Sequence, residues 1–249
     1  MMPEPLEVPP SYVLFSGGKD SFATACKMEE QDRLLGIVML DTGIAVPEWR
    51  DECVAICEQR KWKWEIIPTT TRYEWFVWRF GFPGPAMHAY AMRYLKGRGV
   101  AFFKKVHPGA TLASGVRETE SARRAINTKP ISDFEKVTVY APIYKMTTPE
   151  VWAYVKAKGY SRLSVYSKLG ISGDCLCGAY AREDEREAVR VHYPKVNVFI
   201  ERLEKDAKDR GQKHCSWGWA CKAKRPPKTP QEAITCFECG DATDEALLG

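Results

Sequence analysis

Short apolar runs alternate with longer amphipathic segments along the first part of the chain. The runs have the length of buried strands and lie at residues 13–15, 34–40, 64–68, 111–116 and 137–143. Most of the segments between them carry apolar residues at helical spacing. This alternation predicts an α/β fold in which parallel strands are joined by helices, as in a doubly wound sheet.

Helix start and stop signals support this assignment. Pro47 begins a helix that runs through Gln59, and Thr148 caps a helix that begins at Pro149 and stops at Gly159. Further helical segments are expected at residues 86–96, 100–106, 182–192 and 194–210.

Aromatic residues are concentrated between residues 70 and 85. They are Tyr73, Trp75, Phe76, Trp78, Phe80 and Phe82. Rings at helical spacing usually serve a core, so packing is the preferred interpretation, and stacking on a base is the alternative.

The first apolar run leads into the sequence Ser16-Gly17-Gly18-Lys19-Asp20-Ser21 and then into a helical pattern. The two glycines let the backbone approach a ligand, and the amides that open the helix point towards an anion. Lys19 adds a positive charge, and the Asp20 carboxylate is suited to a magnesium ion that screens phosphates. The loop is not a P-loop, because Lys19 is followed by Asp20 and an earlier glycine of that signature is missing.

Polar residues follow two further apolar runs. Asp41 and Gly43 come directly after the run at 34–40, and Arg117 follows the run at 111–116. Ligands of open α/β sheets bind at the carboxyl ends of the strands, so these residues are expected near the loop. The planar guanidinium of Arg117 is suited to clamp phosphate or sulfate oxygens.

Length and charge set outer bounds. The 249 residues suffice for a full α/β domain with a smaller addition, and the net charge of +5 permits a polyanionic partner without requiring one. No stretch approaches a membrane span, and the first residues lack the charged and apolar regions of a signal peptide. We therefore expect a cytoplasmic protein without a membrane partner, in a compartment that keeps thiols reduced.

Six of the nine cysteines lie at or after residue 175. They are Cys175, Cys177, Cys215, Cys221, Cys236 and Cys239. Four thiolates suffice for a zinc ion or a 4Fe-4S cluster, and the polar, glycine- and proline-containing segments around them favour metal over inert buried thiols. The spacing leaves zinc and iron-sulfur open. The earlier pair, Cys53 and Cys57, is expected in the core.

The character of the chain changes beyond Gly170, where this cysteine-rich stretch begins. We expect a nucleotide-binding α/β domain over residues 1–172 and a helical, cysteine-rich region over residues 173–249.

Several separated motifs resemble those of the phosphoadenosine phosphosulfate (PAPS) reductase family, within the PP-loop ATP pyrophosphatase (adenine nucleotide alpha hydrolase-like) superfamily. The motifs are the loop at 16–21, Leu40–Gly43 with Pro47 and Glu48, Gly115–Arg123, and Pro142 with Trp152. The resemblance covers roughly residues 11 to 180. It implies a Rossmann-like fold in which residues 16–21 hold ATP phosphates, Asp41 and Gly43 lie near the ribose or adenine, and Arg117 faces the anionic end.

One departure from the reductases narrows the expected reaction. Family members that act on an already activated sulfate usually lack the intact Gly-Lys-Asp, whereas this chain keeps Lys19 and Asp20. The resemblance therefore favours an ATP-cleaving enzyme that adenylates an acceptor and releases pyrophosphate. The branches that look most similar put sulfur into nucleic acid. They imply ATP, Mg²⁺, a 4Fe-4S cluster or Zn²⁺, a tRNA or DNA acceptor, and a sulfur donor such as a cysteine desulfurase or sulfide.

Two alternatives remain open at this point. Phe237-Glu238-Cys239-Gly240 resembles the segment around the reductases' catalytic cysteine, although Asp241 follows where a histidine is usual. Cys239 is then either the nucleophile of a sulfonucleotide reductase that uses thioredoxin, or a metal ligand. A nucleotide-binding module without turnover is the third reading. The sequence selects neither the acceptor nor an oligomeric state.

Overall fold

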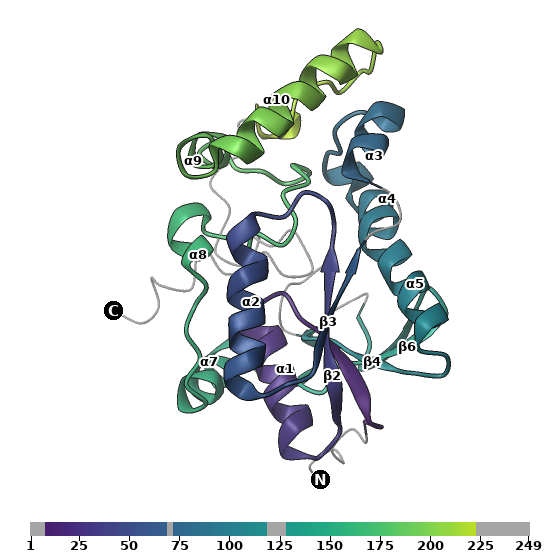
Figure 1. The fold of residues 1–249 in the computed structure, drawn as a ribbon, viewed down its shortest axis with the longest axis vertical. Coiled ribbons are helices and arrows are strands. Elements are labelled where there is room, and N and C mark those ends of the chain that lie inside the picture. The colour runs from purple at the N-terminus through teal and green to yellow at the C-terminus, as the bar shows by residue number, and fades with distance from the viewer. Residues whose placement is uncertain (1–7, 69–71, 119–127, 223–249) are drawn as a thin grey trace.

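A computed structural model describes residues 8–68, 72–118 and 128–222 of the chain. A six-stranded sheet separates two groups of helices (Figure 1). The strands lie in the order β3-β2-β1-β4-β6-β5. Their bounds are β1 Ser11–Leu14, β2 Leu34–Asp41, β3 Trp64–Pro68, β4 Leu112–Ala113, β5 Ile131–Phe134 and β6 Val137–Tyr140.

The sheet is parallel except at one edge. β1, β2, β3, β4 and β6 pair in parallel, as the alternating pattern predicts, whereas β5 pairs antiparallel with β6. The expectation of a wholly parallel sheet is therefore corrected at this strand. The apolar pattern misses β5 because three of its four residues are exposed and the two in the middle, Ser132 and Asp133, are polar. A tight turn at Glu135 and Lys136, with φ of 52° and 62°, joins the two strands.

The helices follow the predicted connections closely. On the α1 side of the sheet they are α1 Lys19–Glu30, α2 Pro47–Arg60, α7 Thr148–Ala157 and α8 Ser164–Leu169. α9 Glu185–His192 and α10 Pro194–Asp209 lie beyond the carboxyl ends of the strands, where α10 also contacts the helix at Tyr73–Phe80 (Figure 1). The other group contains α3 Tyr73–Phe80, η1 Pro85–Met87, α4 His88–Met92, the π-helical turn η2 Arg93–Gly97 and α5 Arg98–Val106. No helix in the described ranges combines the length and the apolar character that a membrane span needs.

One predicted cap is wrong by one residue. The N-cap of α7 is Thr147, whose hydroxyl accepts from the backbone amide of Glu150, while the Glu150 carboxylate accepts from the amide of Thr147. This reciprocal pair is a capping box. Thr148 is consequently the first helical residue, and its hydroxyl is available for another contact.

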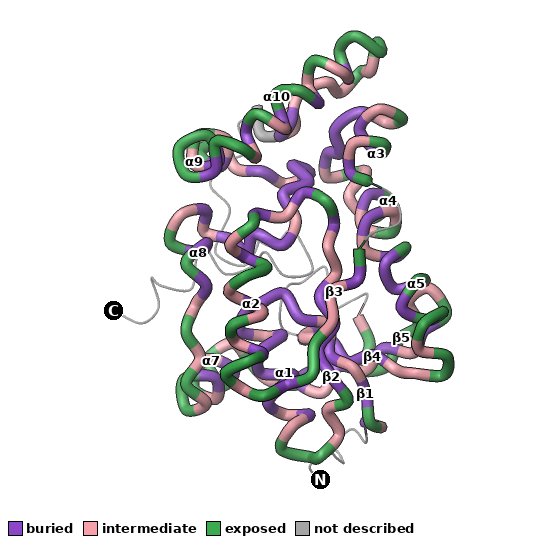
Figure 2. Tube along the Cα trace, viewed as in Figure 1, coloured by how far each residue is buried: buried purple, intermediate pink, exposed green. Residues whose placement is uncertain are grey.

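Each face of the sheet has its own apolar cluster. Val13, Phe22 and Val151 belong to the larger cluster, under α1 and α7. Val38 and Phe103 belong to a smaller cluster under α5. The buried residues follow the strands and the inner sides of the helices (Figure 2). Two buried faces explain why the strands read as continuous apolar runs.

The region beyond residue 172 shares the larger of these cores. Its buried members include Leu176, Val189, Ile200, Leu203 and Trp217. The segment 172–177 also pairs with the loop after β2, because the amide of Val46 donates to Gly173 O at 2.9 Å and the amide of Leu176 donates to Ile44 O at 3.1 Å. The division of the chain after residue 172 stays a prediction, and the two parts are joined by common packing.

Candidate nucleotide-binding site

Two glycines shape the turn between β1 and α1. Gly17 has a φ of +81°, which side-chain-bearing residues rarely adopt. A Cβ atom there would lie 2.6 Å from Leu163 Cδ1 and 2.7 Å from Cys53 Sγ. Gly18 is the N-cap of α1, and Lys19 is the first helical residue. The predicted loop therefore forms between strand and helix, pressed against the core.

The carbonyl groups of this turn are held from within the protein. Trp49 Nε1 donates to Ser16 O at 2.7 Å, and Tyr160 OH donates to Gly17 O at 2.9 Å. No side chain caps α1 at Gly18. Because the first amides of a helix lack intrahelical acceptors, this N-terminus has hydrogen-bonding capacity for an anion.

The two serines of the loop bond to the loop itself. Ser21 Oγ donates to Gly18 O at 2.9 Å, and Ser16 Oγ lies 3.3 Å from Ser21 Oγ. Both residues are buried. In this arrangement the two hydroxyls stabilise the conformation of the turn.

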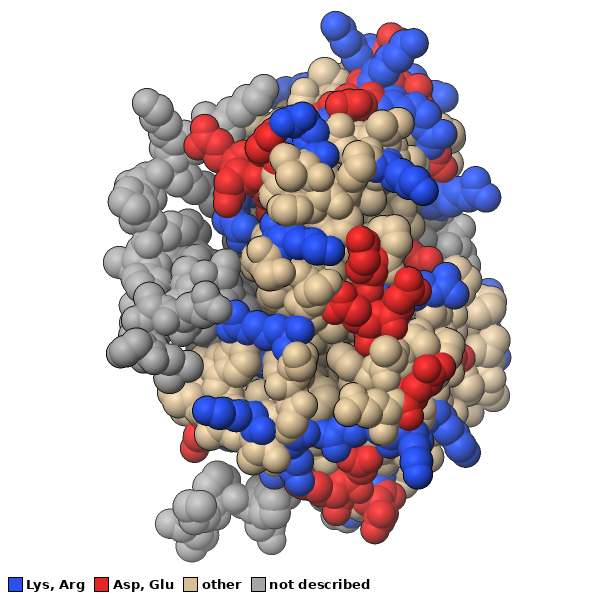
Figure 3. Space-filling model, turned by 60° about the vertical axis from the view of Figure 1, so that its left-hand side comes forward, with Lys and Arg blue, Asp and Glu red and all other residues tan. Residues whose placement is uncertain are grey.

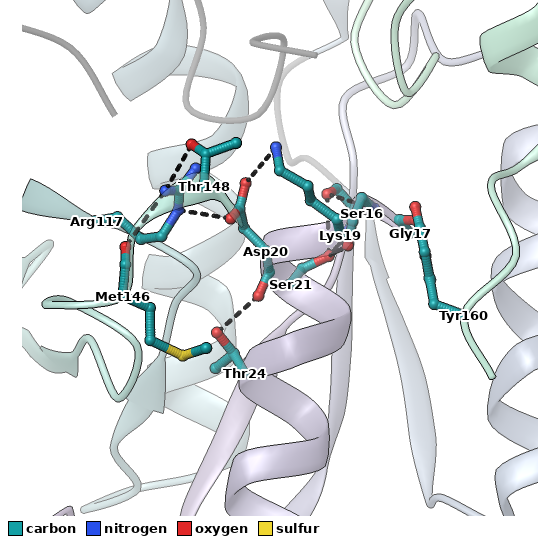
Figure 4. Close-up of polar contacts among 11 residues, drawn as sticks. Ser16, Gly17, Lys19, Asp20, Ser21, Thr24, Arg117, Met146, Thr148 and Tyr160 are labelled. Atoms are coloured by element: carbon teal, nitrogen blue, oxygen red, sulfur yellow. Dashed lines mark hydrogen bonds and ion pairs between the residues drawn. The ribbon is translucent and has the colours of Figure 1, made fainter. Parts of the chain in front are cut away.

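Two cations and one carboxylate meet beside the loop (Figure 4). Asp20 Oδ1 accepts from Arg117 Nε at 2.7 Å, and Asp20 Oδ2 lies 3.3 Å from Lys19 Nζ. The side chains of Lys19 and Arg117 are each only 2% exposed. Arg117 Nη1 also donates to Thr148 Oγ1 at 3.0 Å and to Met146 O at 3.4 Å. One carboxylate thus contacts two cations, and ammonium and guanidinium groups are both suited to contact a phosphate oxygen.

A close backbone contact brings Arg117 to this position. β4 ends at Ala113, and the chain then passes so close to α1 that a Cβ atom on Gly115 would lie 2.7 Å from the carbonyl carbon of Asp20. The strand is consequently shorter than the predicted run at 111–116, because residues after Ala113 turn towards α1. Glycine at position 115 is what lets Arg117 reach Asp20.

Asp20 has two partners within the protein, and its predicted role as a magnesium ligand stays a prediction. Both of its oxygens already face a cation, so Asp20 acts here as the counter-ion of Arg117 and Lys19. A magnesium ion would have to take the place of Lys19, the more distant partner, at Oδ2. The donor chemistry fits magnesium, which prefers carboxylate oxygen, through that one oxygen.

Asp41 and Gly43 lie where β2 ends, at the same edge of the sheet. The amide of Gly43 donates to Asp41 Oδ1 at 2.8 Å, which closes a small turn there. β2 is the direct neighbour of β1, so this turn and the glycine loop leave the sheet side by side. The placement agrees with a role near the nucleotide, and that role stays a prediction.

An ionic contact that the sequence did not indicate lies beyond this turn. Lys96 Nζ lies 2.7 Å from Asp174 Oδ2, with the two side chains 12% and 5% exposed. Ser172 Oγ donates to the other oxygen of Asp174 at 2.5 Å, and Thr42 Oγ1 donates to Asp174 O at 3.1 Å. Lys96 and Asp174 are distant in the chain, so only folding brings them together.

Trp152 and Arg162 were also missed as components of the loop surroundings. Lys19 Nζ lies 5.5 Å from the centroid of the Trp152 ring, and Arg162 Cζ lies 4.6 Å from the same centroid. The negative face of the Trp152 ring attracts both cations and so helps to hold them near the loop. The only sequence signal was Trp152 itself, which belongs to the family motif. Nothing local marked Arg162.

The described residues do not assemble the predicted metal ligands. Cys177 is buried, whereas Cys175 and Cys215 are partly buried and pack against the larger core. Among the described residues, no group of three or more His, Cys, Asp or Glu side chains is placed to hold a metal. The Cys221 side chain and both Cys236 and Cys239 lie outside the described part of the chain.

The early cysteines belong to the core, as the sequence predicted. Cys53 and Cys57 are fully buried. Burial raises the pKa of the Cys57 thiol to about 12, and burial likewise raises the pKa of Cys26 to about 11. Thiols that stay protonated at neutral pH are poor nucleophiles and poor metal ligands.

Charge elsewhere on the surface is mixed. Among the described residues on the face drawn in Figure 3, Lys and Arg side chains are interspersed with Asp and Glu. The net charge of +5 is therefore not gathered into one basic surface on that face.

These features define an α/β protein with a glycine loop and two buried cations at the carboxyl edge of its sheet. The chain belongs to the phosphoadenosine phosphosulfate reductase domain family, whose model matches residues 10–170. The match spans the glycine loop, Asp41 and Arg117. No curated protein matches the chain.

Solved structures with similarity to the chain include enzymes of different activity. Phosphoadenylyl-sulfate reductase from Candida auris, in a phosphate complex, is 13% identical, with a TM-score of 0.49 over 66% of this chain and 79% of that one. A U34-tRNA thiolase from Methanococcus maripaludis with its 4Fe-4S cluster is 15% identical, with a TM-score of 0.44 over 80% and 72%. An NH3-dependent NAD synthetase from Campylobacter jejuni is 15% identical, with a TM-score of 0.46 over 83% and 89%.

Proposed function

We propose that this protein binds ATP at the loop of residues 16–21, adenylates an acceptor and releases pyrophosphate. The observation that carries the proposal is the pair of buried cations, Lys19 and Arg117, beside an uncapped helix N-terminus. An enzyme that cleaves ATP between the α- and β-phosphates must stabilise the charge of the leaving pyrophosphate. This loop supplies amides and cations for that purpose at one place.

The chemistry follows from these residues. An acceptor oxygen forms a bond to the α-phosphorus, the bond from that phosphorus to the bridging oxygen breaks, and the acceptor proton passes to solvent. Lys19 and the first amides of α1 stabilise the pyrophosphate oxygens, while Arg117 orients the nucleotide through its fork of donors. Magnesium, when bound with ATP, screens the phosphate charge.

Sulfur transfer is the second half of the proposal. Sulfur would displace the adenylated oxygen, which leaves with AMP, and the acceptor would be a nucleic acid. Support comes from the intact Lys19-Asp20 pair, which separates this chain from reductases of activated sulfate. The 4Fe-4S cluster, or zinc, also belongs to the proposal, and we derive no step through it because the described residues do not form its site.

A sulfonucleotide reductase is the second candidate. It is favoured by the family that the chain belongs to and by the Glu-Cys-Gly sequence at Cys239. In that reaction the Cys239 thiolate would attack the sulfur of the sulfonucleotide, the bond from that sulfur to the phosphate oxygen would break, and the adenosine phosphate would leave. A dithiol such as thioredoxin would then attack the Cys239 sulfur, release sulfite and end as a disulfide. Pyrophosphate from ATP supports the first proposal, and sulfite from PAPS supports this one.

The decisive experiment measures pyrophosphate release from ATP with candidate acceptors, for wild type and for Lys19→Ala. Loss of a donor aimed at developing charge costs about 100-fold or more, so Lys19→Ala is expected to lose release by at least that factor. Lys27→Ala is the matched control, because Lys27 lies on the same helix with its side chain 34% exposed. Equal activity in both variants would refute the role of the loop. Tight ATP binding without any pyrophosphate would indicate a binding module.

A further inference from the structure

Five aromatic rings form one contiguous cluster on α3, α4 and η2. We call it the aromatic platform, and its members are Trp75, Phe76, Phe80, Tyr90 and Tyr94. Trp75 and Tyr94 are stacked, with centroids 5.4 Å apart and planes 10° apart. Phe80 lies 5.2 Å from both Phe76 and Tyr90. The cluster therefore combines rings of the aromatic segment at residues 70–85 with two tyrosines, Tyr90 and Tyr94, that follow it in the chain.

The platform is only partly a core. Phe76 is fully buried, whereas Trp75 and Tyr90 are 41% and 44% exposed. Phe80 and Tyr94, which are partly buried, each contact both exposed rings and join them into one aromatic surface. Because Trp75 is stacked on Tyr94, its ring is held in place before any ligand arrives.

Guanidinium groups lie directly on these rings. Arg98 Cζ is 4.1 Å from the centroid of Tyr94, and Arg79 Cζ is 5.7 Å from the centroid of Phe80. Both arginines are exposed. Two carboxylates close to the platform in sequence have ion-pair partners of their own, since Glu74 pairs with Arg202 and Glu135 lies 3.6 Å from Arg93. The platform therefore offers flat apolar faces with positive charge at their edges.

The platform is tied to the segment that carries Cys175 and Cys177. Tyr73, at the start of α3, donates its hydroxyl proton to Cys177 O at 2.9 Å. Lys96, in η2, forms the buried ion pair with Asp174. That segment in turn contacts the loop after β2. The helices that carry the platform are therefore connected, through residues 174–177, to the carboxyl edge of the sheet where the glycine loop also lies.

We propose that the aromatic platform binds single-stranded nucleic acid, with bases stacked on Trp75 and Tyr90 and phosphates beside Arg79 and Arg98. Stacking rings with cations at their edges suit a chain that alternates flat bases and phosphates. A protein partner would be matched better by an apolar patch with few charges at its centre. This inference rests on the proposed function, because it names the class of acceptor that the enzyme would modify. Binding to the platform can be measured without any catalytic activity.

The test is fluorescence anisotropy of a labelled, mixed-sequence RNA of about 12 nucleotides, without ATP, against the full-length protein. A matched duplex and a single-stranded DNA of the same sequence are run in parallel. We expect either single strand to bind more tightly than the duplex. Trp75→Ala should weaken single-strand binding about five-fold or more, since one stacked base is lost.

Matched variants separate stacking from general effects. Trp64→Ala is the control for Trp75→Ala, because Trp64 is 40% exposed and is the first residue of β3, whereas the platform follows the carboxyl end of that strand. Arg79→Ala should reduce the slope of log K against log salt concentration by about one, because one phosphate contact is lost. Arg50→Ala is its control, since Arg50 is an exposed arginine on α2. Thermal unfolding verifies that each variant is folded.

The outcomes are distinct. Absence of single-strand binding, a preference for the duplex, or equal effects of Trp75→Ala and Trp64→Ala would overturn the platform. If pyrophosphate release survives any of those results, the proposed function stands without this acceptor. Conversely, Lys19→Ala should bind single strands as wild type does, because Lys19 lies outside the platform.

Discussion

At the scale of single residues, Asp20 balances the charge of the candidate site. The sequence placed it as a magnesium ligand, because a carboxylate beside a phosphate loop suits that ion. In the folded chain it faces Arg117 at 2.7 Å and Lys19 at 3.3 Å. The two cations repel one another unless an anion lies between them, and the incoming phosphates can share that role with Asp20.

This balance predicts the behaviour of Asp20→Asn. Loss of the carboxylate leaves two buried cations without their shared counter-ion, so the free energy of unfolding should fall by about 2 kcal/mol. Added pyrophosphate should restore the midpoint of unfolding more strongly in the variant than in wild type, because the anion replaces the missing charge. Urea unfolding with and without pyrophosphate measures both effects. An equal response of the two proteins would mean that pyrophosphate does not bind here.

The residue scale also shows the limits of sequence reasoning about the site. The loop was predictable because its six residues are contiguous and its chemistry is local. Trp49, Tyr160 and Arg162 come from other elements, and each has an ordinary alternative role in a core or on a surface. Only folding brings them to the loop.

At the scale of elements, the N-terminus of α7 links helix capping to the site. Thr147 forms the capping box with Glu150, whereas its neighbour Thr148 accepts a hydrogen bond from Arg117 at 3.0 Å. Adjacent threonines therefore have separate tasks. The sequence pattern could not separate them, because either residue is a favourable N-cap in front of Pro149.

The two threonines should respond differently to substitution. Thr147→Ala should lower the free energy of unfolding by about 1 kcal/mol through loss of the cap, with little change in pyrophosphate release. Thr148→Val should keep stability close to wild type and lower pyrophosphate release about ten-fold, because Arg117 loses one of the acceptors that orient it. Chemical denaturation and the pyrophosphate assay on both variants test this. The reverse pattern would contradict the assigned roles.

The strand pattern illustrates the same limit for elements. β2 and β3 are mostly apolar in sequence, and their bounds follow the sequence closely. β5 is exposed at three of its four residues, and it pairs with β6 across the turn at Glu135 and Lys136. β4 is shorter than its apolar run because Gly115 brings the chain against Asp20. These departures come from tertiary contact.

At the scale of the whole molecule, the cysteine-bearing segments are held by the common core. Trp217 Nε1 donates to Leu176 O at 2.8 Å, which joins the segment at 175–177 to the segment that follows α10. Cys175 and Cys215 both pack against the larger core. The structure thus holds these two segments on one body, while the last cysteines lie outside the described residues.

If the protein binds a metal, the amount of bound metal should depend on cysteines of both segments. After anaerobic purification we expect iron and the broad visible absorption of a 4Fe-4S cluster, with a substantial loss of metal in Cys175→Ser and in Cys215→Ser. Cys26→Ala is the control, because Cys26 lies on α1 with its side chain fully buried, and its raised pKa keeps the thiol protonated. Iron and zinc analysis with optical spectra decide the result. A colourless zinc protein would replace the cluster by zinc, and a metal-free protein would end the proposal of a metal site.

The sequence by itself determined the parallel α/β framework, the loop at residues 16–21 and the order of the family motifs. These depend on local periodicity and on contiguous residues, which one chain displays directly. Tertiary structure decided the pairing of Asp20 with Arg117, the cap at Thr147, the shared core across residue 172 and the exposure of Trp75. Each of these depends on contacts between residues far apart in the chain, or on which side of a helix meets solvent. Local pattern carries no information about such contacts until the chain has folded.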